Sequence, residues 1–596
     1  MFTIDFEPVG RRGVCSGDQS LLESARQLNV DIVSICGGIG NCDRCKVQII
    51  AGKVSKITLE EQAELSTSEL EQGYRLACQA YPLSDVKLRV PPESLTALQR
   101  TQVEGLEVDV APEPPISTFD VSLPQPTLDT PQADDQNLWA ALARQYGIQH
   151  GTIDLTVQHT FSQQIRAANW QVRVALRGSE IVALGAPSTR WLGLAVDIGT
   201  TKIAAYLVDM ESGMTLASKG LMNPQISYGE DVVARIVAAS KSPENAVKLQ
   251  SLLVEALNQV SVDLCAEASV QQSDILEAVV VGNTAIHHLF LRLPVKQLGL
   301  SPYIPSMRAA LDVKARDLGL HIAPSAYVHL LPNIAGYVGA DHVAMLLATR
   351  IAQADQTTLA IDIGTNTEIC LNHRGKLTSV SCASGPAFEG AHIKFGMRAA
   401  PGAIEHVRLD GEQLEIQTIG AEAPIGICGS GLLDIVAQLR LNNVLGRNGR
   451  LGKHSRVRTR DGVTECVLVE RPGQEAIVLS QKDVRELQLA KAAIRLGIQA
   501  LVEAEGLAEN DIKQVIIAGA FGTFINVESA ITIGMLPSLP LECFKQVGNA
   551  AGTGARLALI SISQRAEAEQ IALQDGYIEL ASVPNFNRRF AEATFL

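Results

Sequence analysis

Four cysteines near the start of the chain have the spacing of a metal-binding set. Cys36, Cys42 and Cys45 lie in the segment ICGGIGNCDRCK, and Cys78 follows in RLACQA. Thiolates are strong ligands for iron and zinc, and the glycines of this segment let backbone amides approach a bound sulfur closely. Eleven cysteines occur in all, and the six beyond residue 80 are scattered singly. The N-terminal clustering therefore favours a metal centre over a set of disulfides.

The spacing C-x5-C-x2-C with a distant fourth cysteine is close to the plant-type iron–sulfur pattern, which has four residues in the first gap. We therefore predict that Cys36, Cys42, Cys45 and Cys78 hold a [2Fe–2S] cluster. A structural zinc site is one alternative, but such sites normally have two close cysteine pairs, and only one C-x2-C pair occurs here. Buried cysteines without a ligand are the other alternative, and Cys15 is expected to be one of these.

A second candidate site recurs in two halves of the chain. VDIGTTK and IDIGTNT each follow an apolar segment and place an aspartate, Asp197 or Asp362, before a Gly-Thr turn. Such a turn can present amides and hydroxyls to phosphate oxygens, and the aspartate would hold Mg²⁺ through water or orient an attacking water. We predict these aspartates as catalytic and a phosphate site built from Gly199, Thr200, Thr201, Lys202, Gly364, Thr365 and Asn366.

The elements that must position these residues divide the chain into four parts. For residues 1–92 the sequence predicts short strands around one helix that begins near Asp18. Residues 93–135 are rich in Pro, Asp and Gln, which predicts a semi-rigid linker. The sequence of residues 136–190 predicts a small α+β unit. Residues 191–596 repeat a strand–turn–strand pattern far apart in sequence, which predicts two duplicated α/β halves. At 596 residues the chain is too long for one core.

Charge and hydropathy exclude several classes of protein. Lys+Arg number 50 against 64 for Asp+Glu, a formal net charge of −14. An acidic chain without a long basic run lacks the electrostatic footprint of a protein that binds nucleic acid or an anionic membrane. No apolar stretch reaches the 18 or so residues of a membrane span, and the N-terminus has no signal-peptide layout. We expect a cytoplasmic protein that binds neither nucleic acid nor membrane.

The duplicated turns resemble the phosphate loops of the actin/hexokinase/sugar-kinase ATPase superfamily, in which ATP lies between two ribonuclease-H-like halves. AGAFG at 518–522 is similar to the adenosine motif of that superfamily, and GICGSGLLD at 426–434 is similar to a glycine-opened helix beside the nucleotide. The resemblance adds Gly429, Ser430, Gly519 and Gly522 to the predicted nucleotide site. For either glycine segment alone, an ordinary packed turn is the alternative.

The whole chain resembles the reductive activators of corrinoid-dependent enzymes. The likeness is carried by CGGIGNCDRC with Cys78, VDIGTTK, IDIGTNTE, SGPAFEGA, IAGAFG and NFNRRFAEATF. It implies a multidomain α/β fold: an N-terminal β-grasp ferredoxin-like domain, a linker, a small α+β middle domain and a C-terminal two-lobed ATPase domain.

The resemblance also implies a function. The [2Fe–2S] cluster would pass one electron to a Co(II) corrinoid protein and restore Co(I), with ATP and Mg²⁺ driving the step. An unidentified low-potential reductant would recharge the cluster, the ATPase domain would form a homodimer, and the linker would let the cluster domain reach the cobalt.

Three other functions fit parts of the sequence. The first is an ATP-coupled electron donor to another low-potential enzyme such as a dehydratase, but those activators usually hold a [4Fe–4S] centre between subunits. The second is a small-molecule kinase with a redox-sensing domain, and the third is a scaffold of the actin type. The set of four cysteines argues against the first of these.

Overall fold

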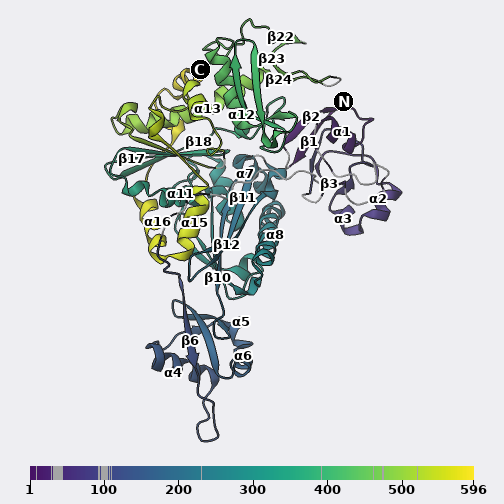
Figure 1. Ribbon diagram of the computed structural model, residues 1–596. Coiled ribbons are helices and arrows are strands. Elements are labelled where there is room, and N and C mark those ends of the chain that lie inside the picture. Colours follow the sequence, from purple (N-terminus) through teal and green to yellow (C-terminus); the bar gives the residue numbers. More distant parts are fainter. Residues whose placement is uncertain are drawn as a thin grey trace.

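The structure is a computed structural model of the chain, and it has three folded units (Figure 1). It describes all residues except 8, 9, 29, 31, 33–39, 41–44, 92, 93, 95–104, 107, 109, 230, 391, 461, 473, 474 and 520, and the side chain of 386. Two of the predicted cluster ligands, Cys36 and Cys42, lie outside the described residues. The predicted architecture of a β-grasp unit, a small α+β unit and a duplicated α/β unit is confirmed.

The N-terminal unit is a five-stranded mixed sheet in the order β2-β1-β5-β3-β4. Its core is built from alternate residues of the strands, such as Ile4 and Phe6 of the first strand. The first helix starts after Ser20, whose side chain forms a capping box with Glu23, slightly later than expected. The elements are β1 (Phe2–Glu7), β2 (Arg11–Cys15), α1 (Leu21–Gln27), β3 (Lys46–Ala51), α2 (Leu59–Glu64), α3 (Thr67–Glu71), β4 (Tyr74–Leu76) and β5 (Val86–Arg89).

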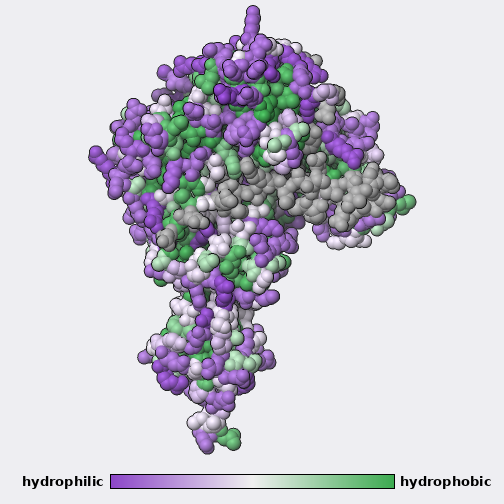
Figure 2. All heavy atoms as spheres, viewed as in Figure 1, coloured by the Kyte–Doolittle hydropathy of each residue, from purple (hydrophilic) through white to green (hydrophobic). Residues whose placement is uncertain are grey.

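The middle unit is a four-stranded sheet in the order β6-β8-β9-β7, covered by helices, and it projects from the rest of the molecule as a narrow stalk (Figure 2). Its edge strand β6 lies inside the segment 93–135 that the sequence predicts as linker, so this sheet draws a strand from that segment. The elements are β6 (Ile116–Ser122), α4 (Asp134–Tyr146), β7 (Thr152–Ile153), α5 (Leu155–Gln158), α6 (Phe161–Ala167), β8 (Gln171–Arg177) and β9 (Glu180–Gly185).

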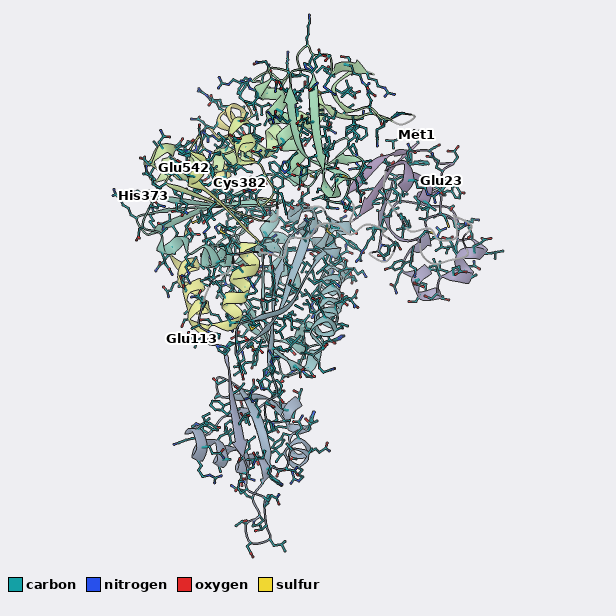
Figure 3. The ribbon with its side chains drawn as sticks, in the orientation of Figure 1. Met1, Glu23, Glu113, His373, Cys382 and Glu542 are labelled. Atoms are coloured by element: carbon teal, nitrogen blue, oxygen red, sulfur yellow. The ribbon has the colours of Figure 1, made fainter. Side chains whose placement is uncertain are left out.

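The residues before β6 are attached to the C-terminal unit. Gly105 forms a β-bridge with Gly548. The backbone N–H of Glu113 donates to the carbonyl of Ile560 at 2.7 Å, and its carbonyl accepts from the N–H of Ile562 at 2.9 Å, at the point where the middle unit joins the rest (Figure 3). Part of the segment predicted as a linker is therefore attached to the C-terminal unit.

The C-terminal unit contains two six-stranded sheets of matching design. In each, a central strand pairs antiparallel with the next strand and parallel with a later one: β10 with β11 and β13, and β16 with β17 and β25. The first sheet holds β10 (Leu192–Ile198), β11 (Lys202–Asp209), β12 (Thr215–Met222), β13 (Ile275–Gly282), β14 (Leu311–Lys314) and β15 (Tyr327–Leu330). The second holds β16 (Thr358–Ile363), β17 (Thr367–His373), β18 (Lys376–Cys382), β25 (Gln514–Ala518), β26 (Phe544–Gly548) and β27 (Gly576–Ile578).

Helices cover both sheets, and two small three-stranded sheets extend the second lobe. The first lobe carries η2 (Pro224–Tyr228), α7 (Val232–Ser240), α8 (Pro243–Ala268), α9 (Thr284–Phe290), α10 (Ala315–Leu318) and α11 (Ala340–Thr349). The second carries η6 (Pro386–Glu389), β19 (Ala403–Asp410), β20 (Gln413–Thr418), β21 (Gly426–Ile427), α12 (Gly429–Leu441), β22 (Val457–Arg460), β23 (Val463–Val469), β24 (Ile477–Ser480), α13 (Gln481–Ala504), α14 (Val527–Thr532), α15 (Ala550–Ile560), α16 (Ile562–Gln574) and α17 (Phe586–Ala593). No described helix has the length and apolar character needed to cross a bilayer.

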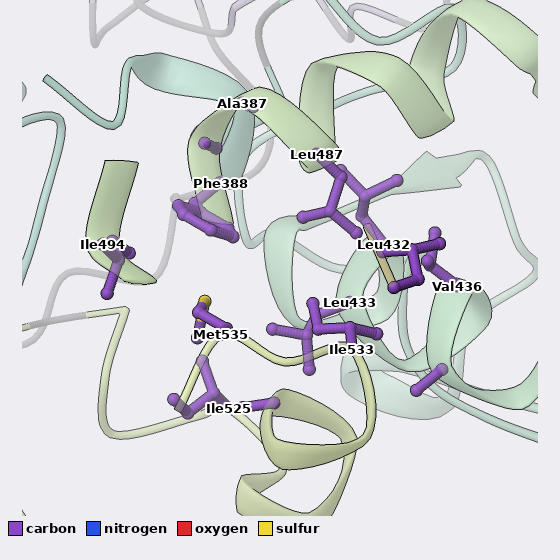
Figure 4. Packing of buried hydrophobic residues seen from close by; sticks show 14 of the residues in the cluster. Ala387, Phe388, Leu432, Leu433, Val436, Leu487, Ile494, Ile525, Ile533 and Met535 are labelled. Atoms are coloured by element: carbon purple, nitrogen blue, oxygen red, sulfur yellow. The ribbon is translucent and has the colours of Figure 1, made fainter. Parts of the chain in front are cut away.

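Two buried cores hold in place the helices and strands that face the space between the two lobes. The core of the second lobe includes Phe388 of η6, Leu432 and Leu433 of α12 and Ile494 of α13 (Figure 4). A separate core joins the two lobes, because it contains residues of both large sheets together with α11 and α15. The helices α11 and α15 therefore fix how one lobe sits on the other.

The close contact between α11 and α15 depends on a glycine. A Cβ atom at Gly554 would lie 2.0 Å from the carbonyl oxygen of Ala344. We expect Gly554→Ala to push the two helices apart and to lower the free energy of unfolding by about 1–3 kcal/mol. Gln570→Ala, on the exposed face of α16, is the control. Calorimetry of both variants measures the effect, and equal stability of the two would contradict this account of the lobe contact.

Candidate functional site

The N-terminal unit brings two of the predicted cluster ligands together. Cys45 directly precedes β3 and Cys78 lies just after β4, and the antiparallel pairing of these strands sets the two sulfurs 3.5 Å apart in a buried position. Two sulfur ligands held about 2.3 Å from one tetrahedral metal would be separated by about 3.8 Å. The observed separation therefore fits two thiolates on a single metal ion.

The surroundings of these sulfurs also suit a metal–thiolate site. The side-chain amide of Gln79 donates to Cys78 Sγ at 3.7 Å, and the N–H of Ala77 donates to the carbonyl of Cys45 at 2.8 Å. Cys15 lies on β2, where burial raises the pKa of its thiol, as expected for a core cysteine. Among the described cysteines of this unit, Cys45 and Cys78 are the pair whose sulfurs lie within contact distance.

The two predicted phosphate turns meet in the C-terminal unit. The first turn joins β10 to β11 and the second joins β16 to β17, and Thr201 Oγ1 lies 3.2 Å from Thr365 Oγ1. A cleft opens between the lobes at this contact. Of the residues predicted for catalysis and nucleotide binding, the following line the cleft: Asp197, Gly199, Thr200, Thr201, Lys202, Asp362, Gly364, Thr365, Asn366, Gly429, Ser430 and Gly519.

The structure separates one predicted residue from this set. Gly522 is not among the described residues that line the cleft, and its carbonyl instead accepts a hydrogen bond from Gln546 at 2.6 Å. Gly519, by contrast, is needed as glycine for two reasons. Its φ is +91°, and a Cβ there would come 2.6 Å from Asp362 Oδ1. The close approach of this turn to the aspartate therefore depends on Gly519.

Side chains behind each turn hold it in place. On the first turn, Asn223 donates to the carbonyl of Gly199 at 2.8 Å and Asn283 donates to Thr200 Oγ1 at 3.1 Å. On the second, Thr365 donates to the carboxylate of Glu389, and the Ser384 hydroxyl donates to the carbonyl of Thr365 at 3.3 Å. The sequence analysis did not predict these hydrogen bonds, because the side chains that form them come from distant segments and have no recognisable spacing in the sequence.

Four of the carboxyl groups that line the cleft have a raised pKa. Enclosure in the protein and the charge of Asp362 raise the pKa of Asp197 to about 7, and enclosure raises the pKa of Asp362 to about 6. The pKa of Asp341, at the start of α11, rises to about 8 because of enclosure and the charges of Asp197 and Asp362. Burial, followed by the charge of Asp341, also raises the pKa of Glu368 well above its usual range.

The sequence analysis missed Asp341 and Glu368 as site residues. Asp341 ends the Gly-rich segment NIAGYVGAD, which is notable in sequence but has no specific motif, and Glu368 follows the second turn on β17. Clustered carboxylates of this kind suit a divalent cation, since hard cations prefer oxygen ligands. The cations lining the described cleft are Lys202 and Arg398. Turns with amides and hydroxyls, two cations and a carboxylate cluster together fit a nucleotide bound with a divalent metal.

Known proteins match this chain along most of its length. Successive family models match the 2Fe-2S iron-sulfur cluster binding domain at residues 4–83, the RACo linker region at 105–190, the RACo middle region at 192–354 and the C-terminal ASKHA domain of RACo at 356–596.

Individual relatives agree with these models. Corrinoid activation enzyme RamQ of Eubacterium limosum is 34% identical over 571 residues, which cover 93% of this chain and 92% of the relative. The [Co(II) methylated amine-specific corrinoid protein] reductase of Methanosarcina barkeri is 24% identical over 429 residues, 66% of this chain and 75% of the relative. The solved structure of a reductive activator for corrinoid,iron-sulfur protein is 34% identical, with a TM-score of 0.74 and coverage of 100% of this chain and 98% of the other.

The carboxyl cluster generates a prediction about stability. The pKa of Asp197 is about 7 in the folded protein and about 4 in the unfolded chain. The free energy of unfolding therefore falls as the pH rises from about 4 to about 7, and it stays lowered at higher pH. Asp197→Asn removes this charge. We therefore expect the free energy of unfolding of the ligand-free variant to exceed that of the wild type by about 1–2 kcal/mol at pH 8, and by less at pH 5.

Calorimetry at both pH values measures the gain. Asp129→Asn, in an exposed loop of the middle unit, is the control and should change nothing. A gain for Asp197→Asn of the same size at both pH values would refute the electrostatic origin.

Proposed function

The chain belongs to the family of reductive activators of corrinoid proteins, and from that membership we propose that it is an ATP-dependent reductase of a corrinoid protein. It would transfer one electron from a [2Fe–2S] cluster to the inactive Co(II) form and restore Co(I). The observation that carries the proposal is the presence, in one chain, of a cysteine pair with metal-ligand geometry and a two-lobed cleft suited to a nucleotide.

The N-terminal unit would be the electron carrier. Cys45 and Cys78 would hold one metal ion of the cluster, with Cys36 and Cys42 on the other. When bound, a plant-type [2Fe–2S] cluster supplies a single electron at a potential near −400 mV. In the described part of the unit, burial of Cys45 and Cys78 keeps water from their sulfurs, and the Gln79 amide stabilises negative charge on Cys78 Sγ. Both effects tune the potential of a thiolate-bound centre.

The cleft would bind ATP through its two turns. The Gly199–Thr201 and Gly364–Asn366 segments would present amides and hydroxyls to the phosphates, and Lys202 and Arg398 would balance their charge. Asp197, Asp341, Asp362 and Glu368 would be the groups available to hold Mg²⁺, and Asp197 or Asp362 would orient the attacking water. Gly429 and Ser430 stand at the N-terminus of α12, where helix amides favour phosphate.

The need for ATP follows from redox energetics. Each 59 mV by which a donor lies above its acceptor lowers a one-electron equilibrium about tenfold. A nucleotide can offset such a deficit only if the protein binds its partner differently in different nucleotide states. The lobes that enclose the cleft are joined through α11 and α15, so closure around a nucleotide would change the surface offered to a partner. We propose further that the ATPase lobes form a homodimer and that a separate low-potential reductant recharges the cluster.

The cluster assignment predicts the effect of single cysteine changes. The anaerobically purified, reduced protein should give a one-electron S = 1/2 EPR signal, and Cys78→Ser should abolish or strongly alter it because one ligand of the centre is lost. Cys15→Ser, at a buried cysteine of the same unit, should leave the signal unchanged. A zinc-loaded, EPR-silent wild-type protein would contradict the electron-carrier role.

The reaction itself is tested by mixing the reduced protein with a Co(II) corrinoid protein of the kind the relatives are named for. We expect the Co(I) absorption to appear with ATP and Mg²⁺, and Asp362→Asn to slow its appearance about 100-fold or more. Asp129→Asn serves as the control. Equal rates of Co(I) formation with and without ATP would rule out the proposed coupling, and phosphorylation of an added small molecule would favour a kinase.

A further inference from the structure

The N-terminal unit lies against both lobes of the C-terminal unit (Figure 1). Its strand β5 packs next to η2 of the first lobe. On the other side, the guanidinium of Arg11, 5% exposed, donates from Nη1 to the carbonyl of Gly396 at 3.0 Å and from Nη2 to the carbonyl of Ile425 at 2.8 Å. Both acceptors belong to the second lobe. The docking surface therefore spans the two lobes, and a change in their separation would disturb it.

A buried ion pair joins the N-terminal unit to a residue of the cleft. Glu7, at the end of β1, accepts a hydrogen bond from Arg398 Nη1 at 3.2 Å, and the two residues are only 1% and 7% exposed. The backbone of the following turn also lies against this arginine, since a Cβ at Gly10 would come 2.9 Å from Arg398 Nη1. The docked unit thus contacts Arg398 with the Glu7 carboxylate and lies close to it at Gly10.

Arg398 is also one of the two cations in the described lining of the cleft, together with Lys202. The same lining holds several carboxylates, which repel a phosphate chain, so a bound polyphosphate needs these cations. Arginine binds carboxylate and phosphate through the same donors. The guanidinium that a phosphate would use is therefore engaged by the carboxylate of the docked unit.

The charge of Glu7 also acts on Arg235, an arginine that holds the first phosphate turn. Arg235, fully buried on α7, donates to the carbonyl of Thr200 in that turn and to the carbonyl of Gly229 at 2.9 Å. Burial lowers the pKa of Arg235 to about 10, and the carboxylates of Glu389, Asp231 and Glu7 oppose this shift. Withdrawal of Glu7 would thus change the electrostatic balance behind the turn as well as at Arg398.

We propose that Glu7 of the N-terminal unit and a nucleotide phosphate compete for Arg398, so that docking of this unit and nucleotide binding oppose each other. This inference rests on the proposed function, because it takes the cleft to be a nucleotide site. A phosphate on Arg398 would weaken the pairing of the buried Glu7 carboxylate with this guanidinium, which is unfavourable. The unit then undocks and carries Cys45 and Cys78 away from the lobes toward a partner. By linkage, undocking strengthens nucleotide binding by the same factor.

The test compares nucleotide affinity in the full-length, cluster-loaded protein and three variants. Glu7→Gln removes the competing charge. Arg11→Met weakens docking at a position outside the cleft lining. Glu64→Gln, on the exposed face of α2, is the matched control. Calorimetric titration with a non-hydrolysable ATP analogue and Mg²⁺ gives the Kd of each, and the visible spectrum checks that each variant keeps its cluster.

We expect Glu7→Gln and Arg11→Met each to bind the analogue about 5- to 50-fold more tightly than wild type, and Glu64→Gln to bind like wild type. Hydrogen exchange of residues 394–398 and 423–428, on which the unit is docked, should accelerate when the analogue is added to wild type. Unchanged Kd values in the two docking variants, or unchanged exchange, would overturn the inference while leaving the proposed function intact. If none of the four proteins binds the analogue, that result would instead count against the proposed function, because the inference takes the cleft to be a nucleotide site.

Discussion

The contact between two Gly-Thr turns is the constraint on which the rest of the structure depends. Each turn follows the central strand of its own sheet, and the two meet with Thr201 Oγ1 and Thr365 Oγ1 3.2 Å apart. Ligand sites in α/β proteins form where the carboxyl ends of parallel strands meet such turns. The same geometry brings Asp197 and Asp362 together with Asp341 and Glu368. The pKa of each carboxyl is raised, so ionisation of the ligand-free site is opposed until a cation enters.

A second constraint determines where the electron carrier can be. The chain is held on the C-terminal unit from Gly105 onward, and the N-terminal unit is docked through Arg11 and Glu7. Fourteen residues lie between Val90 and Gly105, and a chain of that length spans at most about 50 Å. This length limits how far the cysteine site can lie from the C-terminal unit. A carrier and a nucleotide site on one tethered chain can act in sequence on one partner.

The parts of this account that the sequence could predict are those with local signals. The cysteine spacing predicted that Cys45 and Cys78 belong together, and the repeated Asp-x-Gly-Thr pattern predicted the duplicated sheets and nine lining residues of the cleft. The resemblance to the ATPase superfamily added three more, Gly429, Ser430 and Gly519. Strand β6 was obscured because ISTFDVS, although it alternates, is flanked by prolines that indicate a linker. Asp341, Glu368 and the Glu7–Arg398 pair were beyond prediction, since only tertiary packing brings these residues to the cleft. Glycine motifs also do not distinguish a ligand contact from a packed turn, as Gly519 and Gly522 illustrate.

The central claim is that nucleotide turnover in the cleft and electron transfer from the cysteine site are one coupled process. The most direct test is the number of ATP molecules hydrolysed for each Co(I) formed, followed in one anaerobic reaction of the reduced protein with a limiting amount of Co(II) corrinoid protein. The account predicts a fixed ratio throughout the reaction, and hydrolysis that falls to its basal rate once the Co(II) form is exhausted. Hydrolysis that continues at an undiminished rate, or a ratio that varies freely with ATP concentration, would contradict it.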